Sequence, residues 1–262
     1  MSSAASRLLR EVRDIASQTI PVIFGEPEEA DILHWRGMIL GPPHTPYSLG
    51  LFHFDLKFPQ DYPNSAPKVL ITTTSGGHVR FNPNLYSTGK VCLSILGTWR
   101  AEHSGEQWSA VQSAQSILLS IQSLMNDAPY HNEPSFEADD GSGDVQRYND
   151  KITHETLRVA VCEVMEDTLE NRAASSNGTS PVFASTRRQL FFMYYQVRAA
   201  ATRRHPPPPA ATRCRRPPPH SRAPVTAASG LRATPVAPVA LCLSRSHPSL
   251  TRACALLGRR TT

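Results

Sequence analysis

The chain has 262 residues, a hydrophobic fraction of 40% and a formal net charge of +5, which suffices for one large domain or two small ones. The positive charge comes from one end. Residues 201–262 hold 11 of the 27 basic residues, all arginine, and no acid, so residues 1–200 keep 16 basic against all 22 acidic residues, a net charge of −6. The total therefore gives no support for a nucleic-acid-binding fold, and five cysteines without paired spacing argue against a disulfide framework.

The N-terminal sequence has no apolar leader, and no stretch reaches the roughly 18 apolar residues that a membrane span needs. These features are typical of a protein of a reducing compartment. We expect a cytoplasmic protein, with the nucleus as a second compartment, and we predict neither a metal site nor a membrane partner.

The first element is predicted to be an amphipathic helix. Its apolar residues recur at helical spacing and charged residues fill the opposite face. The apolar set is Leu8, Leu9, Val12 and Ile15, and the charged set is Arg7, Arg10, Glu11, Arg13 and Asp14.

Strands are predicted next. Residues 31–40 are predicted to form a strand and residues 41–50 a turn rich in Gly and Pro. Residues 52–58 alternate strictly between apolar and polar side chains. This alternation predicts a half-buried antiparallel strand. Its apolar face comprises Phe52, Phe54, Leu56 and Phe58, and its polar face comprises His53, Asp55 and Lys57. A proline-rich loop and a further strand through Val69 and Ile71 follow.

Helices are predicted in the second half. Ser109 and Gln112 have the spacing of a capping box ahead of an apolar helical stripe that runs to Met125. A longer helix is predicted over roughly 144–170 and another over 182–198. Strands followed by helices indicate an α+β fold.

These patterns divide the chain into a folded core over 1–170, a linker over 171–181, an extension helix over 182–200 and a tail over 201–262. The tail combines proline and arginine without apolar periodicity. Such a segment buries too little surface to offset the chain entropy lost on folding, so we predict that it is disordered.

The segment around Cys92 carries the chemistry. An Asn-Pro-Asn turn, residues 82–84, ends eight residues before this lone cysteine, and no histidine lies within ten residues of it. Taken alone, a lone cysteine is more often a buried core residue than a nucleophile. The Cys-His pairing that a cysteine hydrolase needs is not visible here.

In its motifs the chain resembles the ubiquitin-conjugating enzymes over about residues 6–167. The resemblance rests on "GPPHTPYSLGLFHFDLKFPQDYPNSAPKV", on "NPN" followed by the cysteine and "LSIL", and on "SIQSLMND". Within the family, "RFNPN", "GKVCLSILGTW" and "PYHNEPSFE" are most similar to the large Z-type class with its C-terminal extension. The resemblance implies the family fold: an N-terminal helix, a four-stranded antiparallel meander, a central helix and C-terminal helices.

The resemblance also implies an activity. Cys92 would accept ubiquitin or a ubiquitin-like modifier as a thioester and pass it to a substrate lysine or a ligase. Asn84 would donate to the oxyanion or support the loop, and these two roles stay open. The acceptor-lysine loop would contain His131, Asn132 or Glu133. No cofactor is implied, because ATP is consumed by the upstream activating enzyme, which Arg7, Arg10 and Arg13 would contact.

Three positions depart from the usual family pattern. Asn82 replaces a histidine, Asn64 replaces an apolar ligase anchor, and Ala110 stands where a proline is usual. The last two changes weaken the inference of binding to RING ligases. The alternatives are a non-catalytic ubiquitin-binding module of the same fold, a cysteine hydrolase, and a nucleic-acid binder that would depend on the arginine-rich tail.

Overall fold

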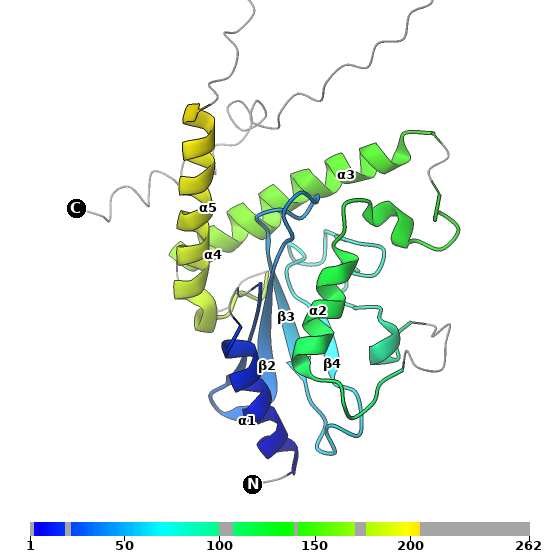
Figure 1. Cartoon of the computed structure of the whole chain (residues 1–262), viewed down its shortest axis with the longest axis vertical. Coiled ribbons are helices and arrows are strands. Elements are labelled where there is room, and N and C mark those ends of the chain that lie inside the picture. The colour runs from blue at the N-terminus through cyan, green and yellow to red at the C-terminus, as the bar shows by residue number, and fades with distance from the viewer. Residues whose placement is uncertain (1–2, 19–21, 100–106, 139–140, 171–176, 205–262) are drawn as a thin grey trace, which may run out of the picture. The chain divides into compact units, whose positions relative to one another are not determined.

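The computed structural model describes residues 3–18, 22–99, 107–138, 141–170 and 177–204 (Figure 1). One compact unit spans residues 1–194, and a second begins at Tyr195. The strands are β1 (Ile23–Glu28), β2 (Asp31–Leu40), β3 (Leu51–Lys57) and β4 (Lys68–Ile71). The helices are α1 (Ser3–Ala16), α2 (Ala114–Leu124), α3 (Asp144–Glu155), α4 (Val164–Leu169) and α5 (Ala184–Arg204), with short helical turns η1 (Ser94–Leu96), η2 (Pro129–Asn132) and η4 (Pro181–Phe183) and a π-helix η3 (Thr156–Glu163).

The four strands form one antiparallel sheet in the order β1-β2-β3-β4, so each strand pairs with its neighbour in sequence. In the central pair, Trp35 lies opposite Leu56 and Ile39 opposite Phe52. The α+β fold and the four-stranded antiparallel meander predicted from the sequence are confirmed.

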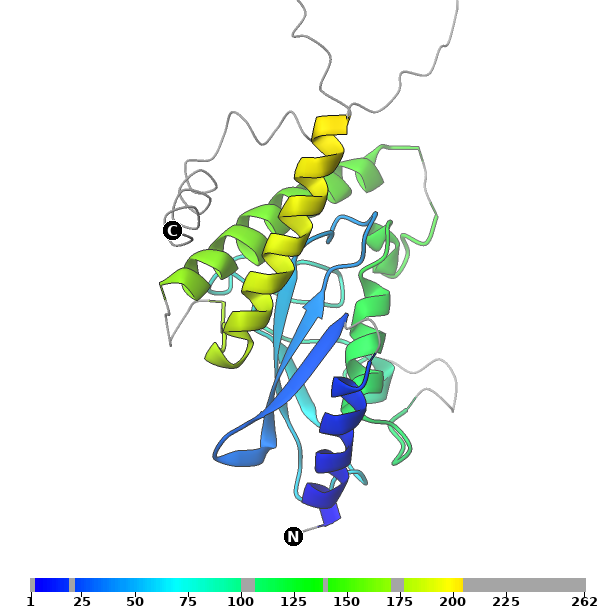
Figure 2. The same ribbon diagram turned by 60° about the vertical axis from the view of Figure 1, so that its left-hand side comes forward.

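The main core lies between one face of the sheet and the helices α1 and α2 (Figure 2). Trp35, Phe52, Phe54 and Leu56 point to this face, as their spacing predicts, and each is at most 1% exposed. Ile117 from α2 packs against them without exposed surface. This face fixes α2 on the sheet.

The opposite face of β3 differs from the prediction. A half-buried strand was expected, yet six of its seven residues are buried and His53 is only 2% exposed. The cause is a second apolar cluster that covers this face with Val164 and Phe183. Burial, followed by the nearby charges of Arg187 and Arg36, lowers the pKa of His53 to about 3.

The predicted start of the central helix is also wrong. Ser109 and Gln112 form only a turn, and the capping box is one helical turn later. The Ser113 hydroxyl accepts from the N–H of Ser116, and the Ser116 hydroxyl accepts from the N–H of Ser113. The helix begins where burial begins, at Ala114, because Ser113 offers the cap closest to the first core residue.

The segment before α5 and the first turn of α5 pack against the rest of the domain. Residues 177–181 were expected to be part of a linker, but Asn177 is 1% exposed and its side chain bonds both the Ser75 N–H and Glu163. Arg187, in the first turn of α5, is 2% exposed and donates to the Thr168 hydroxyl. These contacts join the start of α5 to the end of α4.

Some predictions fall on residues outside the described part of the chain. These are residues 171–176 of the expected linker and the tail beyond Arg204. At its start the tail differs from the prediction, since α5 continues to Arg204.

Candidate active site

Cys92 lies in the long loop between β4 and η1, and only 1% of its surface is exposed. Its backbone N–H donates to the carbonyl oxygen of Asn84 over 2.9 Å. In return, Nδ2 of Asn84 donates to the carbonyl oxygen of Cys92 over 3.1 Å. The structure therefore brings together the two residues that the motif singled out, eight positions apart, through a reciprocal pair of hydrogen bonds.

Asn82, the first residue of the Asn-Pro-Asn turn, has no exposed surface and supports the turn through its side chain. Its Nδ2 donates to the Tyr47 hydroxyl and to the Leu124 carbonyl, each over 2.8 Å. Its Oδ1 accepts from the backbone N–H of Asn84 over 3.0 Å. A buried amide with partners on both sides holds a turn rigidly, so Asn82 supports the turn that carries Asn84.

The three acceptor-loop candidates have different surroundings. Nδ2 of Asn132 donates to the Leu124 carbonyl over 2.9 Å, so this side chain ties the loop to the end of α2. The ring of His131 is bonded through Nδ1 to the Phe136 carbonyl over 2.6 Å. Glu133 is the candidate whose carboxylate faces solvent, with 42% of its side chain exposed.

One residue near the site was not singled out from the sequence. Arg80 forms an ion pair with Glu133 over 3.1 Å and donates to the backbone carbonyls of Asn82 and Pro83. Its guanidinium carbon lies 4.2 Å from the centre of the Tyr86 ring. In the sequence, Arg80 is visible only as a basic residue two positions before the Asn-Pro-Asn turn. This position alone does not indicate an ion pair with Glu133, 53 residues later.

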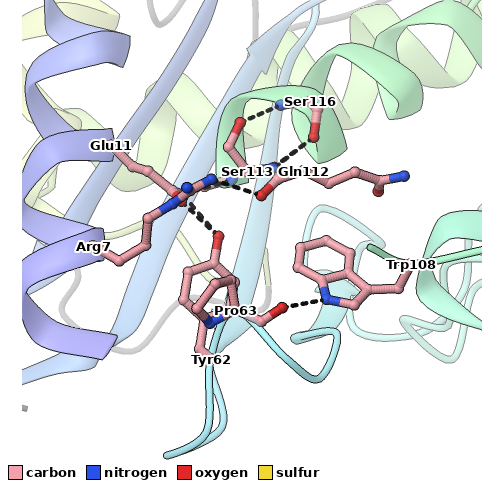
Figure 3. A network of polar contacts seen from close by, with 9 residues as sticks. Arg7, Glu11, Tyr62, Pro63, Trp108, Gln112, Ser113 and Ser116 are labelled. Atoms are coloured by element: carbon pink, nitrogen blue, oxygen red, sulfur yellow. Dashed lines mark hydrogen bonds and ion pairs between the residues drawn. The ribbon is translucent and has the colours of Figure 1, made fainter. Parts of the chain in front are cut away.

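The three arginines of α1 do not form one face. Arg10 and Arg13 are exposed, whereas Arg7 turns inward to Glu11 over 2.6 Å and to the Gln112 carbonyl over 3.0 Å (Figure 3). Glu11 was expected on the charged face but is 2% exposed.

The burial of Glu11 has a physical reason in its partners. Its carboxylate accepts from the Tyr62 hydroxyl (Figure 3) and from the Ala114 N–H, over 2.8 Å in each case. Hydrogen bonds to the Glu11 carboxylate raise the pKa of Arg7, while desolvation by burial, followed by the bond to Glu11, raises the pKa of Tyr62. The network fixes α1, the proline-rich loop and the start of α2 to one another.

The proline-rich loop is also joined to the segment before α2. Nε1 of Trp108 donates to the Pro63 carbonyl over 2.8 Å (Figure 3). The neighbouring positions Asn64 and Ala110, which depart from the family pattern, are exposed, and 86% of Val111 is exposed. These residues form an exposed surface beside Trp108.

Other features of the described residues lie away from this chemistry. No group of three or more His, Cys, Asp or Glu side chains among them is placed to hold a metal, and no described helix has the length and apolar character of a membrane span. A cavity of about 640 Å³ between α1 and β1 includes Ile15 and Phe24 in its lining but neither Cys92 nor Asn84. Cys162 is buried in η3.

The chain is similar to several known proteins. The family model described as "Ubiquitin-conjugating enzyme" matches residues 7–154. "Ubiquitin-conjugating enzyme E2 Z" from Xenopus tropicalis is 49% identical over 160 residues, which is 61% of this chain and 50% of that protein. The Homo sapiens protein of the same name is also 49% identical over 160 residues, 61% of this chain and 44% of that protein.

The chain therefore spans about half the length of these curated relatives. Among solved structures, a ubiquitin-conjugating enzyme E2 domain from Toxoplasma gondii is 30% identical, with a TM-score of 0.46, covering 59% of this chain and 97% of that one. The resemblance to the Z-type class is confirmed by the first two relatives. Because the family model covers more than half of the chain, the protein belongs to the ubiquitin-conjugating enzyme family.

Proposed function

We propose that this protein accepts ubiquitin or a ubiquitin-like modifier from an activating enzyme as a thioester on Cys92, and transfers it to a substrate lysine or to a ligase. The observation that carries the proposal is the reciprocal Cys92–Asn84 pair, placed in a domain of the ubiquitin-conjugating family. ATP is consumed upstream by the activating enzyme, so no cofactor is needed here.

Loading is an exchange between two thioesters. The Cys92 thiolate attacks the carbonyl carbon of the modifier's C-terminal glycyl thioester, a new C–S bond forms, and the activating enzyme's cysteine leaves as a thiolate. A free cysteine has a pKa of about 8.5, and the small thiolate fraction at neutral pH suffices against an acyl group that is already activated. This explains why the site needs no histidine partner.

Loading also requires access to the sulfur. Cys92 is 1% exposed, whereas the four residues after it, Leu93–Leu96, are only partly buried. The side chains that cover the thiol therefore have to move when the activating enzyme docks. The partly buried segment directly after Cys92 is therefore proposed to move.

For transfer, Glu133 is the best-placed of the three acceptor-loop candidates. The side chains of Asn132 and His131 are bonded to backbone carbonyls, and the Glu133 carboxylate faces solvent. An exposed carboxylate attracts a lysine ammonium and orients it. We assign the contact with the incoming lysine to Glu133, and structural roles to the other two.

Asn84 serves first as a brace. Its Nδ2 is already bonded to the Cys92 carbonyl, and the Cys92 N–H is bonded to the Asn84 carbonyl. An oxyanion donor must instead point its N–H to the oxygen that develops beside the sulfur. The contacts support the bracing role, and donation to the oxyanion would require Asn84 to give up its bond to Cys92.

The partners follow from the same surfaces. Arg10 and Arg13 are exposed on α1 and are proposed to contact the activating enzyme, while Arg7 is proposed to hold α1 in place. The surface for ligases is a separate matter. Asn64 and Ala110 stand where an apolar residue and a proline are usual, so the surface around Trp108 offers less apolar contact. Because affinity concentrates in a few apolar or aromatic anchors, we expect weak stimulation by general RING ligases. The cytoplasmic and nuclear location of the protein stays a prediction.

The proposal is tested by charging in parallel with the general and with a specialised activating enzyme, each with ubiquitin and with a second ubiquitin-like modifier. A non-reducing gel, with Cys92→Ala as control, reads the product. We expect a thiol-sensitive adduct, strongest with the specialised enzyme as the Z-type resemblance implies. Loading by the general enzyme alone would contradict this expected preference. The absence of any adduct would favour the alternative, a non-catalytic module that only binds ubiquitin.

A further inference from the structure

Arg80 joins the turn that holds Asn84 to the loop that carries Glu133. Its Nε donates to the Asn82 carbonyl over 3.3 Å, and its Nη2 donates to the Pro83 carbonyl. The same Nη2 lies 3.1 Å from Oε2 of Glu133. One guanidinium therefore contacts the active-site turn and the proposed lysine-binding carboxylate.

The ion pair is the weaker part of this arrangement. Arg80 and Glu133 leave 41% and 42% of their side chains exposed. Exposed ion pairs contribute little and are screened by salt. The carbonyl contacts and the Tyr86 ring hold Arg80 by themselves. A second cation that approaches Glu133 can therefore displace Arg80 from the carboxylate without dismantling the turn.

We propose that Arg80 is a positioning residue that sets the charge preference of the acceptor site. In the resting protein it neutralises Glu133, so an acceptor ammonium must take its place on the carboxylate. The ammonium first loses one proton to solvent, and the amine nitrogen bonds to the thioester carbon. The C–S bond then breaks, Cys92 leaves as a thiolate, and the nitrogen gives its second proton to solvent, which leaves a neutral amide. This inference rests on the proposed thioester transfer.

Two effects of Arg80 can be separated by the charge of the nucleophile. Its hydrogen bonds to the turn affect every nucleophile equally, because all attack the same carbonyl carbon. Its competition for Glu133 affects only nucleophiles that arrive as cations. Free lysine and the neutral amine hydroxylamine therefore distinguish the two effects, and the ratio of their rate constants isolates the second.

The experiment loads the full chain with the modifier, removes the activating enzyme, and measures single-turnover discharge to lysine and to hydroxylamine. In Arg80→Gln we expect the lysine-to-hydroxylamine ratio to rise about two- to fivefold, the range for an exposed ion pair. In Glu133→Gln we expect the ratio to fall. In the double variant, Arg80→Gln should add nothing, because the two residues act through one contact.

Two further variants sharpen the result. Lys90→Gln removes a cation that lies 5.8 Å from the same Tyr86 ring and forms no ion pair with Glu133 in the described structure, so its ratio should equal the wild type. Arg80→Lys keeps the charge but loses the planar fork. It should slow both discharges and leave their ratio unchanged.

An equal fall in both rates in Arg80→Gln would overturn the inference and leave Arg80 as a support of the turn. A rise in the ratio that persists in the Glu133→Gln background, or that Arg80→Lys reproduces, would overturn it too. A wild-type chain that cannot be loaded would refute the proposed function, and this inference with it. If the chain can be loaded but its lysine-to-hydroxylamine ratio is the same in the wild type and in Arg80→Gln, only the inference about Arg80 is refuted.

Discussion

The side-chain amide of Asn84 donates to the carbonyl of Cys92, and the N–H of Cys92 donates back to the carbonyl of Asn84. This pair joins the Asn-Pro-Asn turn to the proposed nucleophile. The turn is itself held by Asn82, whose amide reaches Tyr47 and the end of α2. The position of the cysteine thus depends on buried amides rather than on an acid–base pair.

The first prediction concerns Asn84. Asn84→Ala leaves the buried Cys92 carbonyl without its side-chain donor, which costs about 1–3 kcal/mol. Because Asn84 braces the loop, we expect a lower melting temperature and a similar slowing of loading and discharge. Calorimetry and single-turnover assays of both steps measure this. A selective loss of discharge of about 100-fold or more, at unchanged stability, would instead assign Asn84 to the oxyanion.

The second prediction concerns Glu11. Glu11→Gln keeps the shape of the side chain but removes the charge that Arg7 and the Tyr62 hydroxyl bind. Hydrogen bonds to charged groups are worth about 1.5–3 kcal/mol, so we expect a loss of about that size in the free energy of unfolding by urea. Asp14→Asn, an exposed change on the same helix, is the matched control and should stay within about 0.5 kcal/mol of the wild type. Equal effects of the two substitutions would show that the network does not stabilise the fold.

Types of element were predictable from the sequence because apolar spacing reflects local geometry. The face of β3 with Phe52 and Phe54 is one example. Burial of polar residues was not predictable, because it depends on partners far along the chain. Glu11 is covered by Tyr62 and Ala114, 51 and 103 residues away, and His53 by Phe183.

In the candidate site, too, local contacts were predictable from the sequence and distant ones were not. Asn84 and Cys92 form one local motif and could be found together, since the turn and the cysteine are eight residues apart. Arg80 and Glu133 are 53 residues apart, and their contact depends on where the loop after α2 returns to the turn. Spacing in the sequence carries no information on such a contact.

The third prediction is a pH dependence of stability caused by His53. Its pKa is about 3 in the folded chain and near 6.5 when unfolded. Between these values the unfolded chain binds a proton that the folded chain does not. The free energy of unfolding therefore falls as the pH drops below 6.5, because protonation of His53 favours the unfolded chain. The loss is up to about 1.4 kcal/mol per pH unit.

Urea denaturation between pH 7 and pH 4 tests this, since His53→Gln should remove that part of the slope. His78→Gln, an exposed histidine, is the matched control and should leave the slope as it is. Parallel stability curves for the wild type and His53→Gln would contradict the assignment.

The most direct test of the central claim is the intact mass of the loaded protein for wild type, Cys92→Ser and Cys162→Ser after incubation with activating enzyme, ATP and modifier. We predict a thiol-labile adduct of one modifier on the wild type and on Cys162→Ser. On Cys92→Ser we predict an adduct that resists thiol, because an alkoxide leaves less readily than a thiolate. A thiol-labile adduct on Cys92→Ser, or loss of loading in Cys162→Ser, would contradict the assignment of Cys92 as the carrier.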